Sequence, residues 1–171
     1  MRHSSDNIAI DHVAIAILRR DDCVVLVHQQ TPGAEPYWGL PGGLVEPGEL
    51  VMDALIREVR EESGAHVTAI AQLACLSQID RPAQHMQTVA FIFEVAQWHG
   101  ALESDDPDAE AFGAELVPYA EAWNRLAANG GWPGIQAPLL AYLRGETRAG
   151  SVWFYREELG IQSLVACIVP A

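Results

Sequence analysis

Basic residues are scarce in this sequence. Lys and Arg together number 10 in a chain of 171 residues, against 23 Asp and Glu, which gives a formal net charge of −13. A protein that binds a long nucleic acid needs a basic surface to neutralise the phosphates. The composition therefore argues against a long RNA or DNA partner, including a role at RNA ends, and favours a small-molecule substrate.

Cysteines and long apolar runs are also few. Cys23, Cys75 and Cys167 lie in separate strand-like segments and have neither metal-binding nor redox spacing. This pattern favours free thiols in a reducing compartment. Residues 1–6 lack the apolar stretch of a signal peptide, and the apolar segment 159–171 is too short to cross a bilayer. We therefore expect a cytoplasmic protein without a membrane partner.

The composition nevertheless provides a core. Half of the residues are hydrophobic and 19% are charged, so disorder is excluded and a single domain over residues 1–171 is expected. Strand-like runs with hairpin signals, mixed with helical stretches, predict a mixed sheet flanked by helices. Strands are expected at 8–18, 23–28, 67–77, 87–95, 115–118 and 151–156, and helices at 49–63, 118–128 and 135–143.

Two other segments are expected to lack regular structure. Residues 37–43 are too rich in Gly and Pro for a helix or strand and too apolar for a solvated linker, so we expect them to pack while turning sharply. Residues 102–109 are predicted to form an acidic loop.

The most informative segment begins at Gly43 and ends at Gly64. It gathers glutamates behind a Gly/Pro turn, namely Glu49, Glu58, Glu61 and Glu62. Carboxylates this close repel one another, and each is costly to remove from water unless positive charge lies between them. Oxygen ligands at this density suit a hard divalent cation, Mg²⁺ or Mn²⁺, rather than zinc.

The helical projection places the acids where core residues are expected. At 100° per residue, Glu58 and Glu62 lie within about 40° of each other, and Glu61 lies about 60° to the other side of Glu58. Val51 and Leu55 occupy the column that Glu58 and Glu62 continue. Acids at the C-terminal end of a helix also oppose its dipole, so their presence there calls for a function.

The same projection directs the side chains of Asp53, Arg57 and Arg60 toward the opposite face of the helix. The simpler interpretation of the whole segment is a solvated helix end with an Arg57–Glu61 ion pair. We prefer a metal site, because the acids extend the inward-facing stripe and a Gly/Pro turn leads into the same helix.

Such a site predicts phosphorus chemistry. A cation held by carboxylates can bridge the oxygens of a diphosphate, neutralise developing charge and lower the pKa of a bound water. A carboxylate that is not fully engaged by the metal can accept the proton of that water. The backbone of Gly42 and Gly43 can approach metal or phosphate closely because no Cβ intervenes. The predicted reaction is metal-assisted attack of water on phosphorus.

This segment resembles the signature of the Nudix hydrolases. Nine specified positions fall within 23 residues, and only Ala65 departs, where the family has a larger aliphatic residue; the others are Gly43, Glu49, Arg57, Glu58, Val59, Glu61, Glu62 and Gly64. Residues 38–43 and the hairpin of residues 8–28 are also similar to the family. The resemblance covers about residues 8–128 and leaves 129–171 as a C-terminal extension.

The resemblance implies an α/β/α sandwich around a mixed sheet, here with a helical and strand extension. It implies hydrolysis of the diphosphate linkage in a sugar nucleotide, dinucleoside polyphosphate or nucleotide. A non-catalytic domain that binds a nucleotide or metabolite is the alternative, although such a domain would be expected to have lost an acid from the motif.

Residue roles follow from the same resemblance. Mg²⁺ or Mn²⁺ would be held by Glu58, Glu61, Glu62 and the carbonyl of Gly42, and Arg57 would hold Glu49. Glu58 or Glu61 would be the general base. A later acid, from residues 105–110 or Glu115, is the alternative, although Gly113 occupies the place where many relatives carry a Glu.

Candidate substrate contacts lie on both sides of this motif. Trp38 is a candidate for stacking on a base, Gln29 for facing the cleft, Arg81 for meeting a phosphate, and the backbone of Gly43 for close approach. Packing and strand-end polarity are alternative interpretations of these side chains.

The C-terminal extension has two apolar, β-prone segments, 151–155 and 164–169. They are expected to form either an added strand of the same sheet or a homodimer contact, and we favour the homodimer.

Overall fold

The computed structural model describes residues 8–30, 35–105, 107, 111–128 and 132–171. These residues form strands, helices and one short 3-10 turn in the following order: β1 (Ala9–Arg20), β2 (Cys23–Gln29), β3 (Tyr37–Gly39), β4 (Gly42–Leu44), α1 (Val51–Ser63), β5 (His66–Arg81), η1 (Pro82–Gln84), β6 (Met86–His99), β7 (Ala111–Pro118), α2 (Tyr119–Ala128), α3 (Pro133–Leu143), β8 (Ser151–Glu158) and β9 (Ile161–Ile168).

The strands form one mixed sheet with β1 at its centre. On one side β1 pairs in parallel with β6, followed by antiparallel β5, then β8 parallel to β5, and finally antiparallel β9. On the other side β1 pairs with β4, and through Arg19 and Arg20 with β2, which also pairs with β3 and β7. The prediction of a mixed sheet is therefore confirmed.

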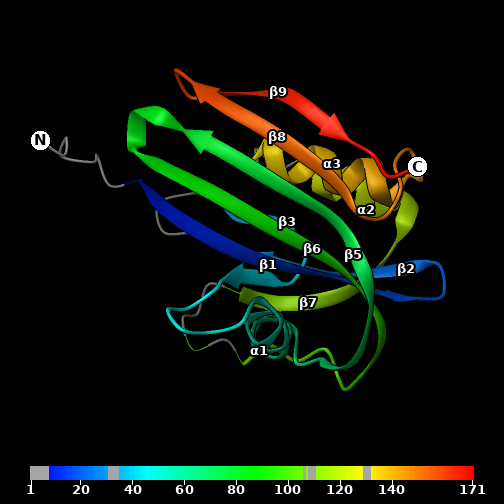
Figure 1. The fold of residues 1–171 in the computed structure, drawn as a ribbon. Helices are drawn as coiled ribbons and strands as arrows, with labels where there is room; N and C mark the ends of the chain where they lie inside the picture. The colour runs from blue at the N-terminus through cyan, green and yellow to red at the C-terminus, as the bar shows by residue number, and fades with distance from the viewer. Residues whose placement is uncertain (1–7, 31–34, 106, 108–110, 129–131) are drawn as a thin grey trace, which may run out of the picture.

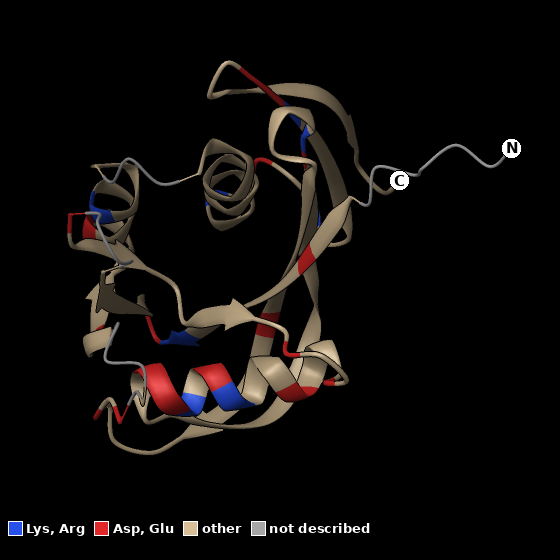
Figure 2. Cartoon of the chain, turned by 90° about the vertical axis from the view of Figure 1, so that its left-hand side faces the viewer, with Lys and Arg blue, Asp and Glu red and all other residues tan. Residues whose placement is uncertain are grey.

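Helices cover both faces of this sheet. In Figure 1, α1 lies on one side of the strands, whereas α2 and α3 lie on the other, and Figure 2 shows the same three layers from the side. The α/β/α sandwich implied by the sequence is confirmed. Among the described residues, no helix is long and apolar enough to cross a bilayer.

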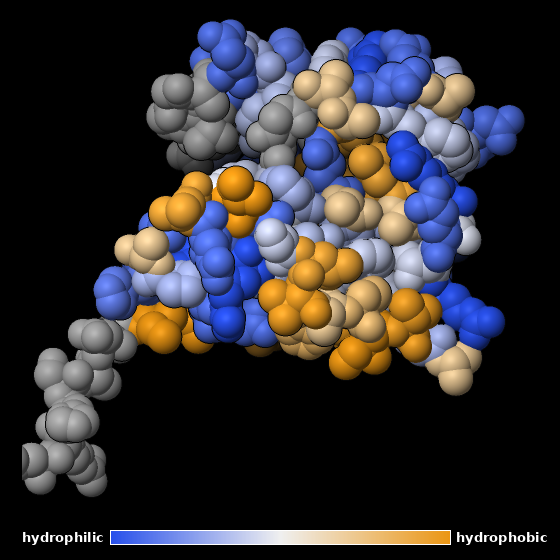
Figure 3. Space-filling view, turned by 90° about the horizontal axis from the view of Figure 1, so that it is seen from above, coloured by the Kyte–Doolittle hydropathy of each residue, from blue (hydrophilic) through white to orange (hydrophobic). Residues whose placement is uncertain are grey.

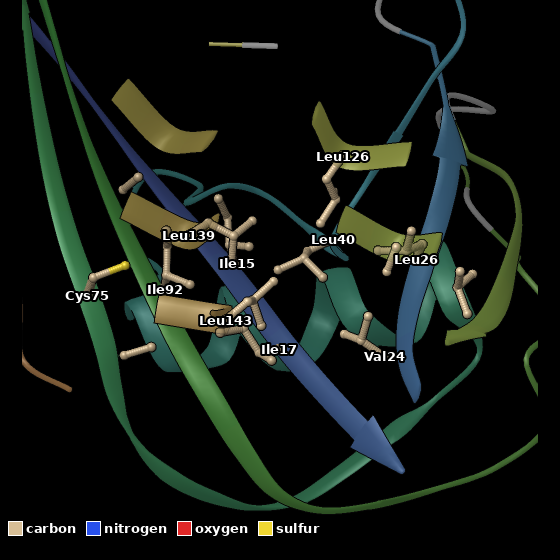
Figure 4. Close-up of a cluster of buried hydrophobic side chains, with 14 residues drawn as sticks. Ile15, Ile17, Val24, Leu26, Leu40, Cys75, Ile92, Leu126, Leu139 and Leu143 are labelled. Carbon is tan, nitrogen blue, oxygen red and sulfur yellow. The ribbon is translucent and has the colours of Figure 1, made fainter. Parts of the chain in front are cut away.

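The alternation of side chains along β1 explains this layering, because successive residues of a strand point to opposite faces. The core beneath α2 and α3 is drawn in Figure 4 and includes Ile15, Ile17, Leu126, Leu139 and Leu143. The core beneath α1 includes Ala14, Ala16, Leu18, Leu55 and Val59. A strand that is buried on both faces is expected to be a continuous apolar run, and residues 13–18 form such a run.

Helix bounds agree with the sequence predictions to within two residues, but several strands differ. Residues 37–43 were expected to be irregular, yet they include all of β3 and the first two residues of β4, each strand being three residues long. Glycine is tolerated there because the backbones approach closely at these short pairings. Strand β5 runs to Arg81 and not to Ser77, since η1 and the left-handed His85 (φ 52°) carry the chain directly into β6.

The C-terminal extension adds strands to the sheet. Strand β8 pairs with β5 from Ser151 to Arg156, and β9 then pairs with β8 as the outermost strand. The added strand that the sequence suggested is confirmed, whereas the homodimer contact stays a prediction.

Candidate metal centre

The fold brings the Gly42–Gly43 turn against the acid helix. Strand β4 is held beside β1, with Gly42 opposite Ile15 and Gly43 opposite Ala14. Helix α1 begins after Leu50 and ends at Ser63. Gly64 caps it, and the φ of 70° at Gly64 is the left-handed conformation that favours glycine at a helix end. The glycine turn that contacts the acids of α1 is therefore part of a strand of the sheet, β4, and not part of a free loop.

Gly42 fixes one of these acids through its backbone. Its N–H donates to Oε2 of Glu62 at 2.7 Å, and Glu62 is only 7% exposed. A Cβ at Gly42 would lie 2.3 Å from the carbonyl oxygen of Ala14, and its φ of 156° is rare for other residues. No side chain fits here, so the amide of Gly42 stays open to the carboxylate.

Gly43 makes room for a second acid. A Cβ at this position would lie 2.5 Å from the carboxyl carbon and Oε1 of Glu58. The carboxylate of Glu58 thus occupies the space that a side chain would fill. Gly42 and Gly43 together form a backbone cradle for Glu58 and Glu62.

Arg57 connects the remaining acids. Its Nε and Nη2 donate to the two oxygens of Glu49, both at 3.0 Å, and its Nη1 donates to Glu58 at 2.7 Å and Glu61 at 3.3 Å. Nη2 also donates to the carbonyl of Leu44 at 3.0 Å. One guanidinium therefore binds three carboxylates and the end of β4.

The sequence prediction that Arg57 faces away from the acids is wrong. A helical projection gives only the direction in which a side chain leaves the helix. The long stem of Arg57 turns its guanidinium across the helix surface, where the negative charge is concentrated and a fork of donors matches carboxylate oxygens. Asp53 and Arg60 are exposed, as expected for the outer face.

These contacts shift two pKa values. The hydrogen bond from Arg57, followed by that from the backbone N–H of Glu46, holds the pKa of Glu49 below its usual range. The hydrogen bond to Glu49 raises the pKa of Arg57 above its already high value, in spite of partial burial. Both shifts favour the charged forms, so the pair stays ionised at neutral pH.

An open pocket of about 700 Å³ lies on the outer side of this cluster. It is lined by Glu49, Asp53, Ile56, Arg57, Arg60, Glu61, Asp105 and Pro107. The charged residues on this helix are visible in Figure 2. Glu58 and Glu62 face β4 instead.

Sequence reasoning missed how a later segment closes the end of α1. The N–H of Asp105 donates to the carbonyl oxygen of Glu61 at 2.9 Å, and Oγ of Ser104 donates to the same atom at 3.3 Å. Gly64 allows this approach, since a Cβ there would lie 2.3 Å from the carbonyl oxygen of Glu103. The sequence predicted Gly64 as the end of the helix, but it did not predict that residues 103–105 pack against this glycine.

The residues fit a hard cation by their chemistry. All of the clustered donors are carboxylate or backbone oxygens, the set that Mg²⁺ and Mn²⁺ prefer, and the Gly42–Gly43 cradle leaves space for two of them. Within the described residues, no three Asp, Glu, His or Cys side chains are already grouped to surround a metal ion. Arg57 holds Glu58 and Glu61 instead.

The structure does not bring all of the candidate substrate residues to this cluster. Trp38 stacks on His28 with ring centroids 4.7 Å apart, and the Arg125 guanidinium lies 4.4 Å from its ring centre. Gln29 lies over Gly39, with Nε2 2.5 Å from the position of a Cβ. Glu115 is paired with Arg125 at 3.0 Å and not with the α1 acids.

Arg81 lies at the far end of β5. Arg81 pairs with Met86 of β6, and Met86 pairs with Ala9 of β1. Gly43 pairs with Ala14, five residues further along β1. At 3.3 Å per residue, Arg81 and Gly43 are therefore separated by roughly 16 Å along the strand direction. Arg81 donates to Sδ of Met86 and Oγ1 of Thr88, and its guanidinium lies over Trp132.

The three-layer fold and the acid helix behind a glycine turn define a class of domain, and comparison with known proteins identifies it. The family model for the NUDIX domain matches residues 10–142. The chain belongs to the Nudix family.

Individual relatives agree with this assignment. The ADP-ribose pyrophosphatase of Methanocaldococcus jannaschii is 32% identical over 111 residues, which are 63% of this chain and 66% of that protein. The human 8-oxo-dGDP phosphatase NUDT18 is 32% identical over 120 residues, 69% of this chain and 35% of the human protein. The chain therefore spans less than two thirds of the length of either relative.

Solved structures share the fold. The solution structure of the Escherichia coli ORF135 protein has a TM-score of 0.64 at 25% identity and covers 81% of this chain and 91% of its own. A mutator MutT protein from Bacillus halodurans has a TM-score of 0.65 at 19% identity, covering 93% and 97% of the two chains.

Proposed function

We propose that this protein is a divalent-metal-dependent hydrolase that cleaves the diphosphate linkage of a nucleoside diphosphate derivative by attack of water on phosphorus. The observation that carries the proposal is the Arg57 cluster. One guanidinium binds Glu49, Glu58 and Glu61, while Glu62 is fixed on the amide of Gly42. The clustered carboxylates repel one another and are held together by the positive charge of Arg57. A divalent cation could supply the same kind of stabilisation.

Glu58, Glu61 and Glu62, with the carbonyl of Gly42, would hold Mg²⁺ or Mn²⁺. When bound, such an ion supplies charge neutralisation at the phosphate oxygens and an acidified water. Glu58 or Glu61 must first release Arg57, whereas Glu49 can keep both of its hydrogen bonds to that residue. Arg57 and Glu49 would therefore position the helix against its loop, and Gly43 would admit Glu58 to the cradle.

A carboxylate that is not fully engaged by the metal must take a proton from the attacking water. Glu58 and Glu61 are the first candidates. Among the later acids that the structure describes, Asp105 is the better candidate, because its backbone is bonded to Glu61 and it lines the same pocket. Asp106, Asp108 and Glu110 lie outside the described residues. Glu115 is less suited, since it pairs with Arg125 on α2.

The substrate class rests on the relatives. Those named above act on ADP-ribose and 8-oxo-dGDP, and another relative is the ADP compounds hydrolase NudE of Escherichia coli, 30% identical over 89 residues. All three names describe nucleoside diphosphate compounds. We propose such a compound as the substrate and the cytoplasm as the location of the protein, where its three free cysteines would stay reduced.

The direct test is a hydrolysis screen with Mg²⁺ and Mn²⁺. ADP-ribose, 8-oxo-dGDP, a dinucleoside polyphosphate and nucleoside triphosphates are incubated with the purified protein, and product release is measured. We expect turnover of at least one compound that stops when the metal is chelated. Background rates with all compounds and both metals would contradict the proposal.

Substitution of the acids tests the residues. Glu61→Gln and Glu62→Gln should each lower turnover by at least about 100-fold, since even indirect partners of a metal are worth 10- to 100-fold. Glu121→Gln, the same change on the exposed surface of α2, is the matched control and should retain the wild-type rate. Near-native rates in both site variants, with unchanged circular dichroism, would rule out the assignment.

A further inference from the structure

Two histidines outside the acid cluster face each other across a pair of strands. His66 is the first residue of β5 and His99 the last of β6, and the register places them directly opposite each other. The centres of their imidazole rings are 5.3 Å apart, and the ring planes are inclined by 16°. In the part of the chain that the structure describes, no other two histidines make a ring contact with each other.

This pair lies beside the end of α1, because His66 follows the glycine that caps the helix. Helix α1 is low in Figure 1, whereas Figure 3 views the molecule from above and shows hydrophobic residues exposed on that side. The histidine pair is therefore separate from the apolar surface of the molecule.

The alternation of side chains along β5 and β6 exposes both rings. Val67 and Trp98, the strand neighbours of the two histidines, pair with each other and pack against the core beneath α1. Neighbouring residues of a strand point to opposite faces, so His66 and His99 point away from this core, and both are exposed. Neither imidazole makes a hydrogen bond or ion pair with another described residue. Their nitrogens are available to a ligand from solution.

The spacing of the two rings matches a tetrahedral metal site. Zinc binds an imidazole nitrogen at about 2.0–2.1 Å, so the centre of each ring lies about 3.2 Å from the ion. Two rings at tetrahedral positions then have their centres about 5.2 Å apart, close to the 5.3 Å observed here. Adjacent positions of a square-planar site, the geometry typical of Cu²⁺, would need about 4.5 Å.

Only the orientation of the rings must change for an ion to bind. Nearly parallel rings direct their nitrogens side by side, whereas a shared ion requires the nitrogen lone pairs to converge. Rotation about χ2 brings the lone pairs together, because this torsion of histidine is broad and both rings are exposed. The backbones are already held by the β5–β6 pairing, which extends as far as Arg81 and Met86. An ion can therefore be bound without movement of the strands.

The chemistry of the pair selects a different ion from that of the α1 acids. Neutral imidazole is a ligand for Zn²⁺, Ni²⁺ and Cu²⁺, whereas Mg²⁺ and Mn²⁺ take oxygen ligands. Two histidines fill two positions of a tetrahedral site, and water can fill the other two. The net charge of −13 also attracts cations to the protein.

We propose that His66 and His99 form a zinc site that is separate from the candidate metal centre on α1. Bound zinc holds together the two chains that flank the end of this helix. One chain enters β5 from Gly64, and the other leaves β6 at Gly100, where a Cβ would lie 2.9 Å from the carbonyl oxygen of Gly64. The proposal goes beyond the hydrolase activity and does not depend on it.

Calorimetric titration of the full chain with Zn²⁺ tests this site. The buffer contains excess Mg²⁺, which competes for the acids of α1, and a phosphine reductant, which keeps the three cysteines reduced. We expect the affinity for Zn²⁺ to fall at least about 10-fold in His66→Gln and in His99→Gln, since even an indirect partner of a metal is worth roughly 10- to 100-fold. His12→Gln, the same change at another exposed histidine, is the matched control and should retain the wild-type affinity.

Nitrogen NMR of the imidazole rings in the wild type does not depend on a variant that folds. Zinc should shift a ring nitrogen of His66 and of His99 together and leave His12 unchanged. The proposal is overturned if the wild type does not bind Zn²⁺, if zinc shifts neither ring of the pair, or if both site variants bind zinc as tightly as the wild type. A loss of affinity in His12→Gln equal to that in the site variants overturns it as well. Neither measurement involves turnover, so a protein that hydrolyses no substrate still tests the zinc site.

Discussion

At the scale of single residues, two neighbouring glycines are required for different reasons. A side chain at Gly42 would meet the rigid backbone of β1 at Ala14, whereas a side chain at Gly43 would meet the movable carboxylate of Glu58. The first contact is part of the fold and the second is part of the candidate site.

This difference predicts two phenotypes from the same change. Gly42→Ala should lower the free energy of unfolding by more than about 1 kcal/mol, because neither its φ nor the β1 backbone can adapt. Gly43→Ala should leave stability nearly unchanged but displace Glu58, and so weaken Mn²⁺ binding and turnover. Denaturant unfolding and Mn²⁺ titration of both variants provide the measurement.

The opposite pattern, with a stable Gly42→Ala and an unfolded Gly43→Ala, would contradict the geometry. Wild-type Mn²⁺ affinity in a folded Gly43→Ala variant would show that Glu58 does not need the cradle.

At the scale of elements, a polar cluster ties α3 to the sheet. The phenol of Tyr142 on α3 donates to Glu94 on β6, and Nε2 of Gln72 on β5 donates to the Tyr142 oxygen at 2.9 Å. Arg19 of β1 pairs with Glu94 at 3.0 Å. Burial, reinforced by the bond to Glu94, raises the pKa of Tyr142 to about 12.

The raised pKa predicts a loss of stability in alkali. A tyrosine of the unfolded chain ionises near pH 10, so the contribution of the neutral phenol is fully present below that pH and is lost as pH rises toward 12. The effect should be smaller than about 2.7 kcal/mol, the value of a two-unit difference in pKa, because the phenol is partly solvated.

Denaturant unfolding of the wild type and Tyr142→Phe measures this effect. Between about pH 10 and 12, the free energy of unfolding should fall more steeply for the wild type than for Tyr142→Phe. Equal slopes for the two proteins would show that the phenol of Tyr142 is not protected in the folded state.

The same scale shows how far local pattern reaches. Helix α1 and its inward-facing acids were predicted because the helical repeat of 3.6 residues can be recognised from residues three and four positions apart. Strands β3 and β4 were not predicted, because a three-residue strand is too short to show a periodic pattern. These strands form only by pairing with β2 and β1. The extension of β5 to Arg81 was missed for a similar reason: its end is set by the hairpin with β6.

At the scale of the whole molecule, metal binding should stabilise the fold. An ion that binds only the native state adds about 2.7 kcal/mol at 100 times its dissociation constant, or a rise of roughly 5 to 10 °C in the unfolding temperature of a domain of this size. We expect this rise with Mg²⁺ for the wild type and little or none for Glu62→Gln. Differential scanning fluorimetry at one fixed protein concentration measures both.

Glu121→Gln serves again as the control and should show the wild-type rise. An equal rise in Glu62→Gln and the wild type would mean that the ion binds elsewhere, and no rise in either would leave α1 without a metal.

The sequence by itself determined the acid helix, the glycine turn before it, the apolar strand near the N-terminus and the family signature, because each depends on residues that are close along the chain. Tertiary structure decided which distant groups these residues meet: Glu62 on the amide of Gly42, Asp105 at the end of α1, and β9 at the margin of the sheet. Contacts between distant segments follow from how the layers pack as a whole, and no local periodicity encodes them.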